Sequence, residues 1–360
     1  MCVAHAPQDA ITERLFQSAI GTLELFGVYL GRTLGLYRTL HEHGSLNPAG
    51  LADHARIAPR YAREWLEQQA VAGFLVVDRE ATDDAARTYR LPDDYVGVLA
   101  DEEHPAHIAP FAHMMVGVAR ALPRVVEAYR TGAGVPYAEF GADFRYGQGG
   151  INRPAFVSDL TGVWLPGVPD LHETLLREPG RRIADVGCGA GWSTIALARA
   201  YPDAEVVGFD LDEASIRDAV KNAAAAGVRV RFVCADGAAL TADGPFHLIT
   251  LLETLHDMAH PDEALAAMRA ALAPGGSLFI ADERVAEEFS APGDDIERMM
   301  YGWSISHCLP VGMDGVRARP VGTVIRPATV RRLAQATGFG SCEVLDIPNQ
   351  LFRFYRLRAA

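Results

Sequence analysis

The segment Ala184–Ser193, "ADVGCGAGWS", decides the fold of this 360-residue chain. A short apolar run typical of a strand precedes it, and the alanine-rich helical pattern of 192–201 follows it. The glycines at 187, 189 and 191 let the backbone turn tightly and approach a ligand closely. Their spacing, Asp-x-Gly-x-Gly-x-Gly, differs from the Gly-x-Gly-x-x-Gly expected for a dinucleotide. A carboxylate at Asp185 would repel a pyrophosphate, so it favours a ligand that carries an ammonium group.

Strand and helix patterns alternate after this loop. Short apolar runs separated by helices of 10–16 residues predict βαβ units and a parallel, doubly wound α/β sheet. A last strand pair is expected near the end of the chain. The expected strands are 182–186, 205–209, 228–236, 247–253 and 277–283, with the final pair in 342–357, and the expected helices are 192–201, 213–227 and 261–276.

Acidic residues follow two of these strands. Asp210, with Leu211 beside it, ends the second strand, where a carboxylate can bind ribose hydroxyls. Asp236, followed by Gly237, ends the third strand, where it can accept a hydrogen bond from an adenine amino group. Each acid alone also fits a helix cap or a solvated strand end. Together, at the carboxyl ends of successive strands, they favour a nucleoside site.

The first hundred residues have a different pattern. Helical periodicity runs from about Thr12 to His43, and the glycines at 27, 31 and 35 are expected to divide it into two helices. Ser45 and Pro48 mark a short helix, Pro59 starts another, and 74–78 and 87–92 read as a hairpin. Helix, helix, hairpin is the layout of a winged-helix domain. Its second helix pairs Arg60 and Arg63 with Glu64 and Glu67, which favours dimerisation or a pocket wall over DNA binding.

Composition narrows the function classes. The formal net charge is −13, with 49% hydrophobic and 22% charged residues. A net negative charge disfavours nucleic acid or an anionic membrane as a partner. The five cysteines, which include Cys2, show no CxxC spacing, so neither disulfides nor a metal site are predicted. No signal peptide or membrane span is recognised, and we expect a cytoplasmic protein.

These motifs resemble the ordered motifs of class I S-adenosylmethionine-dependent methyltransferases over about Arg181–Arg356. The matching segments are Asp185–Gly191, Asp210, Asp236–Gly237 and "HLITLLETLHDM" (247–258). With the front domain included, the chain resembles an actinobacterial group of winged-helix methyltransferases sometimes labelled transcriptional regulators. "PRYAREWLEQQAVAGFL", "ADERVAEEF" and "MYGWSISHCLPVGM" carry part of that match.

The resemblance implies a Rossmann-like seven-stranded sheet whose last strand runs antiparallel. It implies that Gly187, Gly189 and Gly191 contact the methionine part of S-adenosylmethionine. It also implies that Asp210 binds the ribose, that Asp236 and Gly237 bind the adenine, and that Glu253 or its neighbours line the sulfonium end.

The histidine in "LHDM", His256, follows the fourth strand, where acceptor and methyl group should meet. It is either the base that deprotonates a hydroxyl acceptor or a capping or pocket-lining residue. Asp257 should point away from His256 on a helix, so we expect Glu283, at the end of the fifth strand, to orient the ring. His307 is a second candidate base or a core histidine.

The sequence thus predicts a methyltransferase that acts on a small-molecule acceptor, most simply a hydroxylated metabolite. Nitrogen or carbon methylation and a cofactor-sensing winged-helix regulator stay open as alternatives. The apolar N-terminal helices favour a homodimer. Expected domains are 1–100 (winged helix), 101–180 (helical connector and lid) and 181–360 (methyltransferase). Candidate acceptor-pocket residues, which also fit a core or connector, are Tyr146, Asn152, Arg153, Trp164, Met300, Tyr301 and Trp303.

Overall fold

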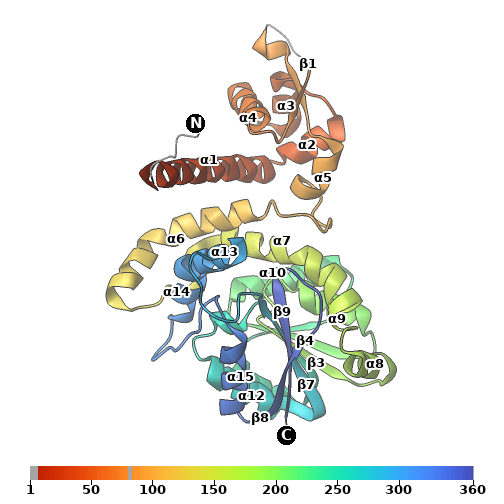
Figure 1. Cartoon of the computed structure of the whole chain (residues 1–360). Helices are drawn as coiled ribbons and strands as arrows, with labels where there is room; N and C mark the ends of the chain where they lie inside the picture. The colour runs from red at the N-terminus through yellow and green to blue at the C-terminus, as the bar shows by residue number, and fades with distance from the viewer. Residues whose placement is uncertain (1–6, 80–82, 360) are drawn as a thin grey trace. The chain divides into compact units, whose positions relative to one another are not determined.

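A computed structural model describes residues 7–79 and 83–359. Two compact units divide the chain (Figure 1). The N-terminal unit runs up to Val116 and also includes Tyr146–Pro154, and the sheet unit comprises Gly117–Arg145 and the chain from Ala155 onward. Two helices, α6 (Phe111–Thr131) and α7 (Gly141–Asp159), each contain residues of both units. Cys2 lies outside the described residues.

The N-terminal unit has the predicted helix–helix–hairpin order. The Asn47 side chain accepts a hydrogen bond from the Gly50 N–H, which caps the first of the two helices, and Pro59 begins the second. Asn47 therefore caps the short helix whose start the sequence predicted at Ser45 and Pro48. The elements are α1 (Pro7–Thr33), α2 (Leu36–His43), α3 (Pro48–Ala55), α4 (Pro59–Val71), β1 (Val76–Arg79), η1 (Asp84–Ala86), β2 (Thr88–Arg90) and α5 (Asp93–Leu99).

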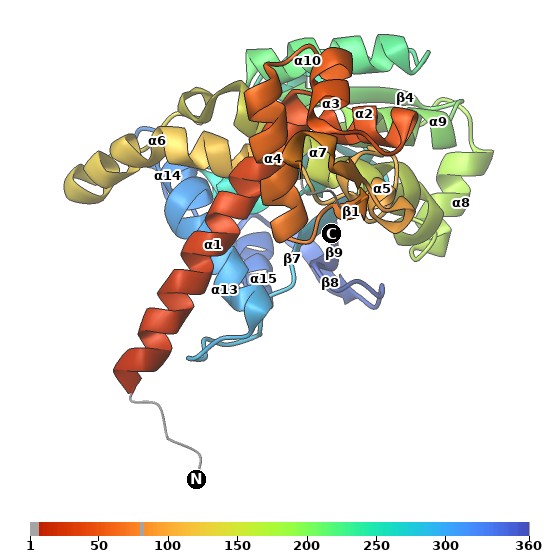
Figure 2. The same cartoon turned by 90° about the horizontal axis from the view of Figure 1, so that it is seen from above.

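Glycines in α1 serve its packing rather than a break in the helix. A Cβ at Gly31 would lie 2.5 Å from the Tyr37 ring and 2.6 Å from the Trp65 ring, so α1 can approach these rings closely only without a side chain there. The helix ends instead near Gly35, which has a left-handed φ of 69°. The run is thus divided once, at Gly35, and the N-terminal part of α1 projects beyond the other helices of this unit (Figure 2).

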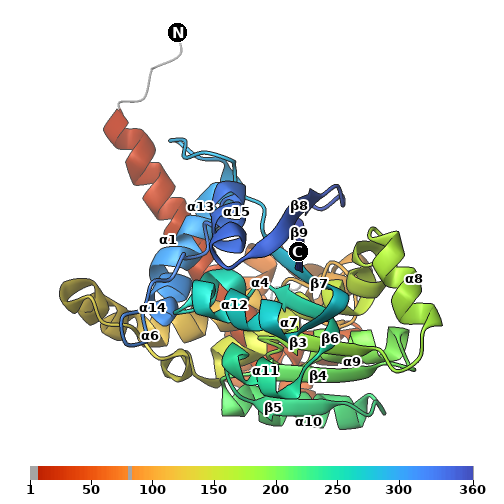
Figure 3. The same cartoon turned by 90° about the horizontal axis from the view of Figure 1, so that it is seen from below.

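In the described part of the chain, seven strands form the sheet of the second unit in the order β5-β4-β3-β6-β7-β9-β8 (Figure 3). Strands β3 to β7 pair in parallel, and β9 runs antiparallel to both β7 and β8. This confirms the Rossmann-like seven-stranded sheet with an antiparallel last strand. The strands are β3 (Arg182–Val186), β4 (Glu205–Asp210), β5 (Arg231–Cys234), β6 (Phe246–Leu252), β7 (Leu272–Glu283), β8 (Phe339–Leu345) and β9 (Phe352–Ala359).

Helices cover both faces of this sheet. Alternate residues of a strand point to opposite faces, and in β7 they belong to two separate apolar cores. Leu278 and Ile280 of β7 belong to one apolar core, whereas Phe279 and Ala281 belong to the other. The helices and helical turns are η2 (Tyr137–Phe140), η3 (Leu160–Trp164), α8 (Pro169–Arg177), α9 (Trp192–Ala200), α10 (Glu213–Ala225), η4 (Gly237–Ala239), α11 (Leu240–Asp243), η5 (Leu255–Asp257), α12 (Pro261–Ala271), α13 (Asp295–Trp303), η6 (Ser304–Cys308), α14 (Leu309–Gly312) and α15 (Pro327–Ala336).

Two sequence expectations need correction. The helix predicted over 261–276 ends at Ala271, because Pro274 and Gly275 cannot extend it, and the chain continues directly as β7. Trp164, a candidate pocket residue, is fully buried in the second core, with its ring 5.5 Å from Phe352 and 5.1 Å from Phe354. No described helix has both the length and the apolar character needed to cross a membrane.

Candidate functional site

The carboxyl ends of the parallel strands gather the predicted site residues at one edge of the sheet. Val186 of β3 is in register with Phe209 of β4 and with Leu251 of β6, and Leu252 is in register with Ala281 of β7. The loops after these strands therefore start side by side. This edge is where doubly wound folds bind their ligands.

The glycine loop after β3 depends on left-handed backbone. Gly187, Gly189 and Gly191 have φ angles of 72°, 51° and 81°. A Cβ on Gly187 would lie 2.2 Å from Cγ2 of Thr254, so the loop after β6 packs directly on this glycine. A Cβ on Gly189 would meet no heavy atom within 4 Å. The backbone at Gly189 is thus open to a ligand, whereas Gly187 is needed for packing.

Asp210 holds this loop in place. Its Oδ2 accepts a hydrogen bond from the Gly189 N–H at 2.8 Å, and its Oδ1 accepts one from the Asp212 N–H at 2.8 Å. Burial raises the pKa of Asp210 despite these two hydrogen bonds. The neighbouring Leu211 side chain is 73% exposed. Each Asp210 oxygen still has a lone pair that could accept a hydroxyl hydrogen.

Asp185 has a different role from the one expected. Its Oδ2 accepts hydrogen bonds from the hydroxyls of Ser193 and Thr194, both at 2.6 Å, and its Oδ1 accepts one from Thr250 at 2.8 Å. The residue is 1% exposed, and burial raises its pKa. The carboxylate therefore joins the start of α9 to β6 from inside the protein, and it presents little surface to an ammonium group.

The adenine-side candidates follow β5. Asp236 is exposed and directly precedes the turn η4, and Gly237, which begins that turn, is partly buried. Asp236 thus lies at the same strand-end edge as Asp210, as the sequence predicted.

His256 occupies the turn after β6 and is held between two carboxylates. Its Nδ1 lies 2.6 Å from Oδ1 of Asp282, and its Nε2 lies 3.3 Å from Oδ1 of Asp257. The residue is 3% exposed. Burial alone would lower its pKa, but Asp282 and then Asp257 raise that pKa well above the usual range. The two carboxylates therefore stabilise an imidazolium at this position.

Both expectations about the partners of His256 were wrong. Asp282, not Glu283, makes the hydrogen bond to the ring. Asp257 turns back toward the other ring nitrogen, because η5 is a single tight turn and not the regular helix that the prediction assumed.

Glu283 is instead close enough to Glu253 for the two carboxyl groups to interact electrostatically. It is 6% exposed, and burial followed by the charge of Glu253 raises its pKa well above the usual range. Glu253 has a left-handed φ of 53°, which is unfavourable for a residue with a side chain. Its N–H donates to the Ala281 carbonyl at 2.8 Å, so the sheet holds this strained conformation in place. Burial and the neighbouring Glu253 charge therefore favour the protonated form of the Glu283 carboxyl group.

His307 lies in an aromatic cluster. Its ring stacks on Phe144 at 3.9 Å and meets Phe140 edge-on at 4.5 Å between centroids. Burial lowers the pKa of His307 to about 4. Tyr137, which the sequence did not suggest, lies 5.8 Å from the His307 ring. Burial, then Asp210, Asp212 and Asp257, raise the pKa of Tyr137 well above its usual range, so it stays a neutral phenol beside these acids.

The other pocket candidates lie in two places. In the N-terminal unit, the Tyr146 hydroxyl lies 2.9 Å from a nitrogen of Arg32 and 3.0 Å from an oxygen of Glu102, and Arg153 also pairs with Glu102. Asn152 lies near them on α7. In the sheet unit, α13 carries Met300, which is buried, Tyr301, which is 38% exposed, and Trp303, whose ring lies 6.4 Å from Phe144.

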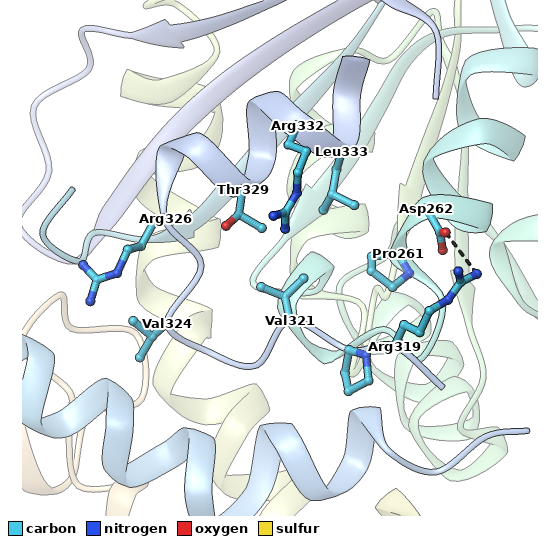
Figure 4. Close-up of a pocket in the computed structure, with 10 residues that line it drawn as sticks. Pro261, Asp262, Arg319, Val321, Val324, Arg326, Thr329, Arg332 and Leu333 are labelled. Carbon is cyan, nitrogen blue, oxygen red and sulfur yellow. Dashed lines mark ion pairs between the residues drawn. The ribbon is translucent and has the colours of Figure 1, made fainter. Parts of the chain in front are cut away.

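A separate hollow of about 530 Å³ lies near the start of α12 and along α15 (Figure 4). Arg319, Arg326 and Arg332 line it, but Arg319 pairs with Asp262 and Arg326 pairs with Glu297. None of the predicted site residues lines this hollow.

Comparisons with known proteins agree with this geometry. Residues 183–276 match the model of the methyltransferase domain, and residues 23–100 match that of the Rv2258c-like winged HTH domain. The ubiquinone biosynthesis O-methyltransferase of Bordetella avium is 35% identical over 28% of this chain and 42% of its own length. The demethylmenaquinone methyltransferase of Thermus thermophilus is 35% identical over 38% of this chain and 59% of its own length. The chain thus spans about half the length of these curated relatives.

Solved structures share the fold over the whole chain. The mitomycin 7-O-methyltransferase MmcR superposes with a TM-score of 0.68 at 16% identity, covering 98% of this chain and 99% of that one. Human N-acetylserotonin methyltransferase in complex with SAM gives 0.67 at 16% identity, with both chains fully covered.

Proposed function

We propose that this chain, which carries a methyltransferase domain and an N-terminal winged helix–turn–helix domain, methylates a hydroxyl group of a small molecule with S-adenosylmethionine. The single observation that carries the proposal is the buried His256–Asp282 pair at the sheet edge where a glycine loop and Asp210 meet. This arrangement combines a nucleoside-binding edge with a base.

The strand-end residues fit the cofactor. Gly189 leaves its backbone open, and the Asp210 oxygens can accept hydrogen bonds from a ribose diol. Asp236 and Gly237 would hold the adenine, with Leu211 beside the ribose. Gly187 and Gly191 would shape the loop that holds the methionine part of the cofactor. Glu253, which follows β6, would line the sulfonium end of the cofactor. When bound, the cofactor supplies an electrophilic methyl group, and the protein supplies position and a proton acceptor.

His256 is the proposed proton acceptor. Asp282 fixes the ring through Nδ1 and stabilises the imidazolium that forms when Nε2 takes a proton. Asp257 adds a second negative charge on the Nε2 side. Proton transfer from a hydroxyl to the neutral form of this ring is therefore favoured, and His256 acts as a base only at a pH that leaves its ring neutral. The pKa of His307 is lowered to about 4, so His307 is a poor base. We assign its ring to the lining of the acceptor pocket.

The acceptor region is apolar and aromatic with few polar groups. Phe144, His307 and Trp303 form an aromatic cluster in the sheet unit. This chemistry suits a flat, partly aromatic metabolite better than a charged polymer. The similar proteins include a ubiquinone biosynthesis O-methyltransferase and the mitomycin 7-O-methyltransferase MmcR.

The winged-helix part is proposed to mediate pairing of two copies rather than DNA binding. The arginines of α4 are neutralised on the same helix, Arg60 by Glu64 and Arg63 by Glu67. On α1, Phe16, Leu23 and Leu30 recur every seven residues and are each at least 49% exposed, with Phe26 between them. A seven-residue apolar repeat on a projecting helix is typical of a coiled-coil seam. We propose a cytoplasmic homodimer joined through α1.

A methyl-transfer screen tests the reaction. The purified protein is incubated with isotope-labelled S-adenosylmethionine and panels of phenols, alcohols and amines, and labelled products are detected by mass spectrometry. Label in a phenol or alcohol product that is lost with His256→Ala is the expected result. Label found only in amine products, unaffected by His256→Ala, would overturn the hydroxyl assignment.

A further inference from the structure

A cluster of possible metal ligands lies inside the sheet unit and consists of His256, Asp257 and Cys308. One ligand atom of each lies within 4.8 Å of the others, and His256 and Cys308 are 3% and 6% exposed. The Asp257 side chain is 19% exposed. Imidazole nitrogen, thiolate sulfur and carboxylate oxygen are the three donor types that Zn²⁺ prefers. Two local turns, η5 and η6, bring them together from positions about fifty residues apart in the chain.

Asp282 adds the feature that separates this cluster from a chance gathering of polar groups. It holds Nδ1 of His256 at 2.6 Å, which leaves Nε2 to face Asp257 and Cys308. A carboxylate on the far nitrogen of a histidine is the usual support of a metal-bound imidazole. Asp257 Oδ1 is buried and makes no hydrogen bond within the described residues. Nε2 of His307, the residue before Cys308, also makes none there.

We propose that this cluster binds one Zn²⁺ ion through His256 Nε2, Asp257 Oδ1 and Cys308 Sγ, and that the bound ion inhibits methyl transfer. Ligand atoms of a tetrahedral zinc site stand roughly 3.3–3.8 Å apart. The Nε2–Oδ1 separation of 3.3 Å already fits, and the remaining separations need to close by at most about 1 Å. Two carboxylates beside one imidazole also supply the negative charge that a dication needs.

Inhibition follows because zinc and the proton of the acceptor would need the same lone pair on one ring nitrogen. Nε2 of His256 cannot coordinate zinc and accept a proton from the acceptor at the same time. Only this inhibitory consequence rests on the proposed function; the metal site itself does not. A protein that binds zinc without losing activity would contradict the role of His256 as a base, and not the site.

Metal binding is best measured without an activity assay. Cd²⁺ serves as the probe, because cadmium bound to a thiolate gives a near-ultraviolet charge-transfer absorption. The full chain is used with Cys2, Cys234 and Cys342 replaced by serine, so that only the two buried thiols remain. We expect one equivalent of Cd²⁺ to give this absorption and Zn²⁺ to displace it.

Matched variants locate the site. Cys308→Ser should abolish the absorption, whereas Cys188→Ser, at the same 6% exposure but in the glycine loop, should leave it unchanged. Asp282→Asn should weaken zinc binding on the order of 10-fold to 100-fold by calorimetry. Circular dichroism checks that each variant is folded. The absence of a cadmium absorption in the three-serine background, or its survival in Cys308→Ser, would overturn the proposal.

The activity arm then tests inhibition. Zn²⁺ added to one equivalent should lower turnover, and a chelator should restore it. Activation by zinc, or zinc binding without any change in turnover, would overturn the inhibitory part.

Discussion

Asp282 Oδ1, near the end of strand β7, lies 2.6 Å from His256 Nδ1 in the turn η5 that follows the neighbouring strand β6, and both residues are almost fully buried. This hydrogen bond fixes the ring orientation and directs Nε2 toward Asp257 and Cys308. The geometry is that of an oriented, charge-stabilised base, and it places the proposed chemistry on rigid elements of the sheet.

Asp282→Asn should lower kcat for a hydroxyl acceptor on the order of 10²-fold, because the amide cannot stabilise the imidazolium. Affinity for S-adenosylhomocysteine should stay unchanged, since Asp282 contacts the ring and not the glycine loop. Steady-state kinetics in the presence of a chelator, beside calorimetry, make the comparison. Asp257→Asn is the matched control and should have a smaller effect, because its contact is longer. Equal effects of the two variants would contradict the assigned roles.

Gly187→Ala should destabilise the protein and weaken cofactor binding. The left-handed φ alone costs about 1–2 kcal/mol, and the new Cβ also meets Thr254 at 2.2 Å. Gly275→Ala is a matched control, because Gly275 has a φ of 75° and open space around it. Urea unfolding should show a larger loss of stability for Gly187→Ala. Thr254→Ser removes the clashing methyl group and should partly restore that loss; no restoration would argue against the clash.

Asp185→Ala should lower the free energy of unfolding by about 2–4 kcal/mol, because three buried hydroxyls lose their acceptor. The exposed pair of Asp218 and Lys221 provides the control, and Asp218→Ala should cost at most about 0.5 kcal/mol. Chemical denaturation measures both. A cofactor defect in Asp185→Ala without loss of stability would restore the ammonium-binding role that the sequence suggested.

His107 should make the N-terminal unit sensitive to acid. Burial and then the Arg32 guanidinium lower the pKa of His107 to about 4, so the unfolded chain binds a proton that the folded chain does not between about pH 6.5 and about pH 4. The neutral His107 ring therefore stabilises the folded state fully above the usual histidine pKa. This stabilisation is lost as the pH falls toward 4. Between about pH 6.5 and about pH 4.5 the wild type should lose roughly 2 kcal/mol more than His107→Gln. If the free energy of unfolding in urea changes with pH to the same extent in the wild type and in His107→Gln, His107 is not the group responsible.

Leu23→Glu should convert the proposed dimer to a monomer, because it places a charge in the seven-residue repeat of α1. Size-exclusion chromatography with light scattering measures the mass of the particle. Val71→Glu, an exposed apolar position on α4, is the control and should leave the mass unchanged. A monomeric wild type would rule out the α1 seam.

The fold could be predicted from the sequence because its signals are local. The glycine loop, the apolar strands and the acids at strand ends each depend on neighbouring residues, and parallel pairing then brings the strand ends together. The helix–helix–hairpin order was predicted for the same reason. Helix ends are harder to predict from local pattern, because α12 passes directly into β7 after Ala271.

The partners of His256 could not be predicted as readily. Choosing between Asp282 and Glu283 required knowing which face of β7 each residue occupies. Asp282 has the same parity as Leu278 and Ile280, which share a core with Leu255, the neighbour of His256. The apolar alternation along β7 therefore indicates that Asp282 faces the same side of the sheet as Leu255. Cys308, His307 and Tyr137 reach the site from distant turns, and no local pattern predicts such contacts.

Calorimetric titration of the intact protein with S-adenosylhomocysteine tests the central claim most directly. We expect binding of one ligand per chain, weakened at least about 10-fold by Asp210→Ala, which loses about 1.4 kcal/mol or more of hydrogen bonding to the ribose. Asp212→Ala keeps the backbone N–H that donates to the Asp210 carboxylate and removes the cap on the Ser215 N–H, and it should retain most of the affinity. No binding by the intact protein, or equal binding by wild type and Asp210→Ala, would contradict the account.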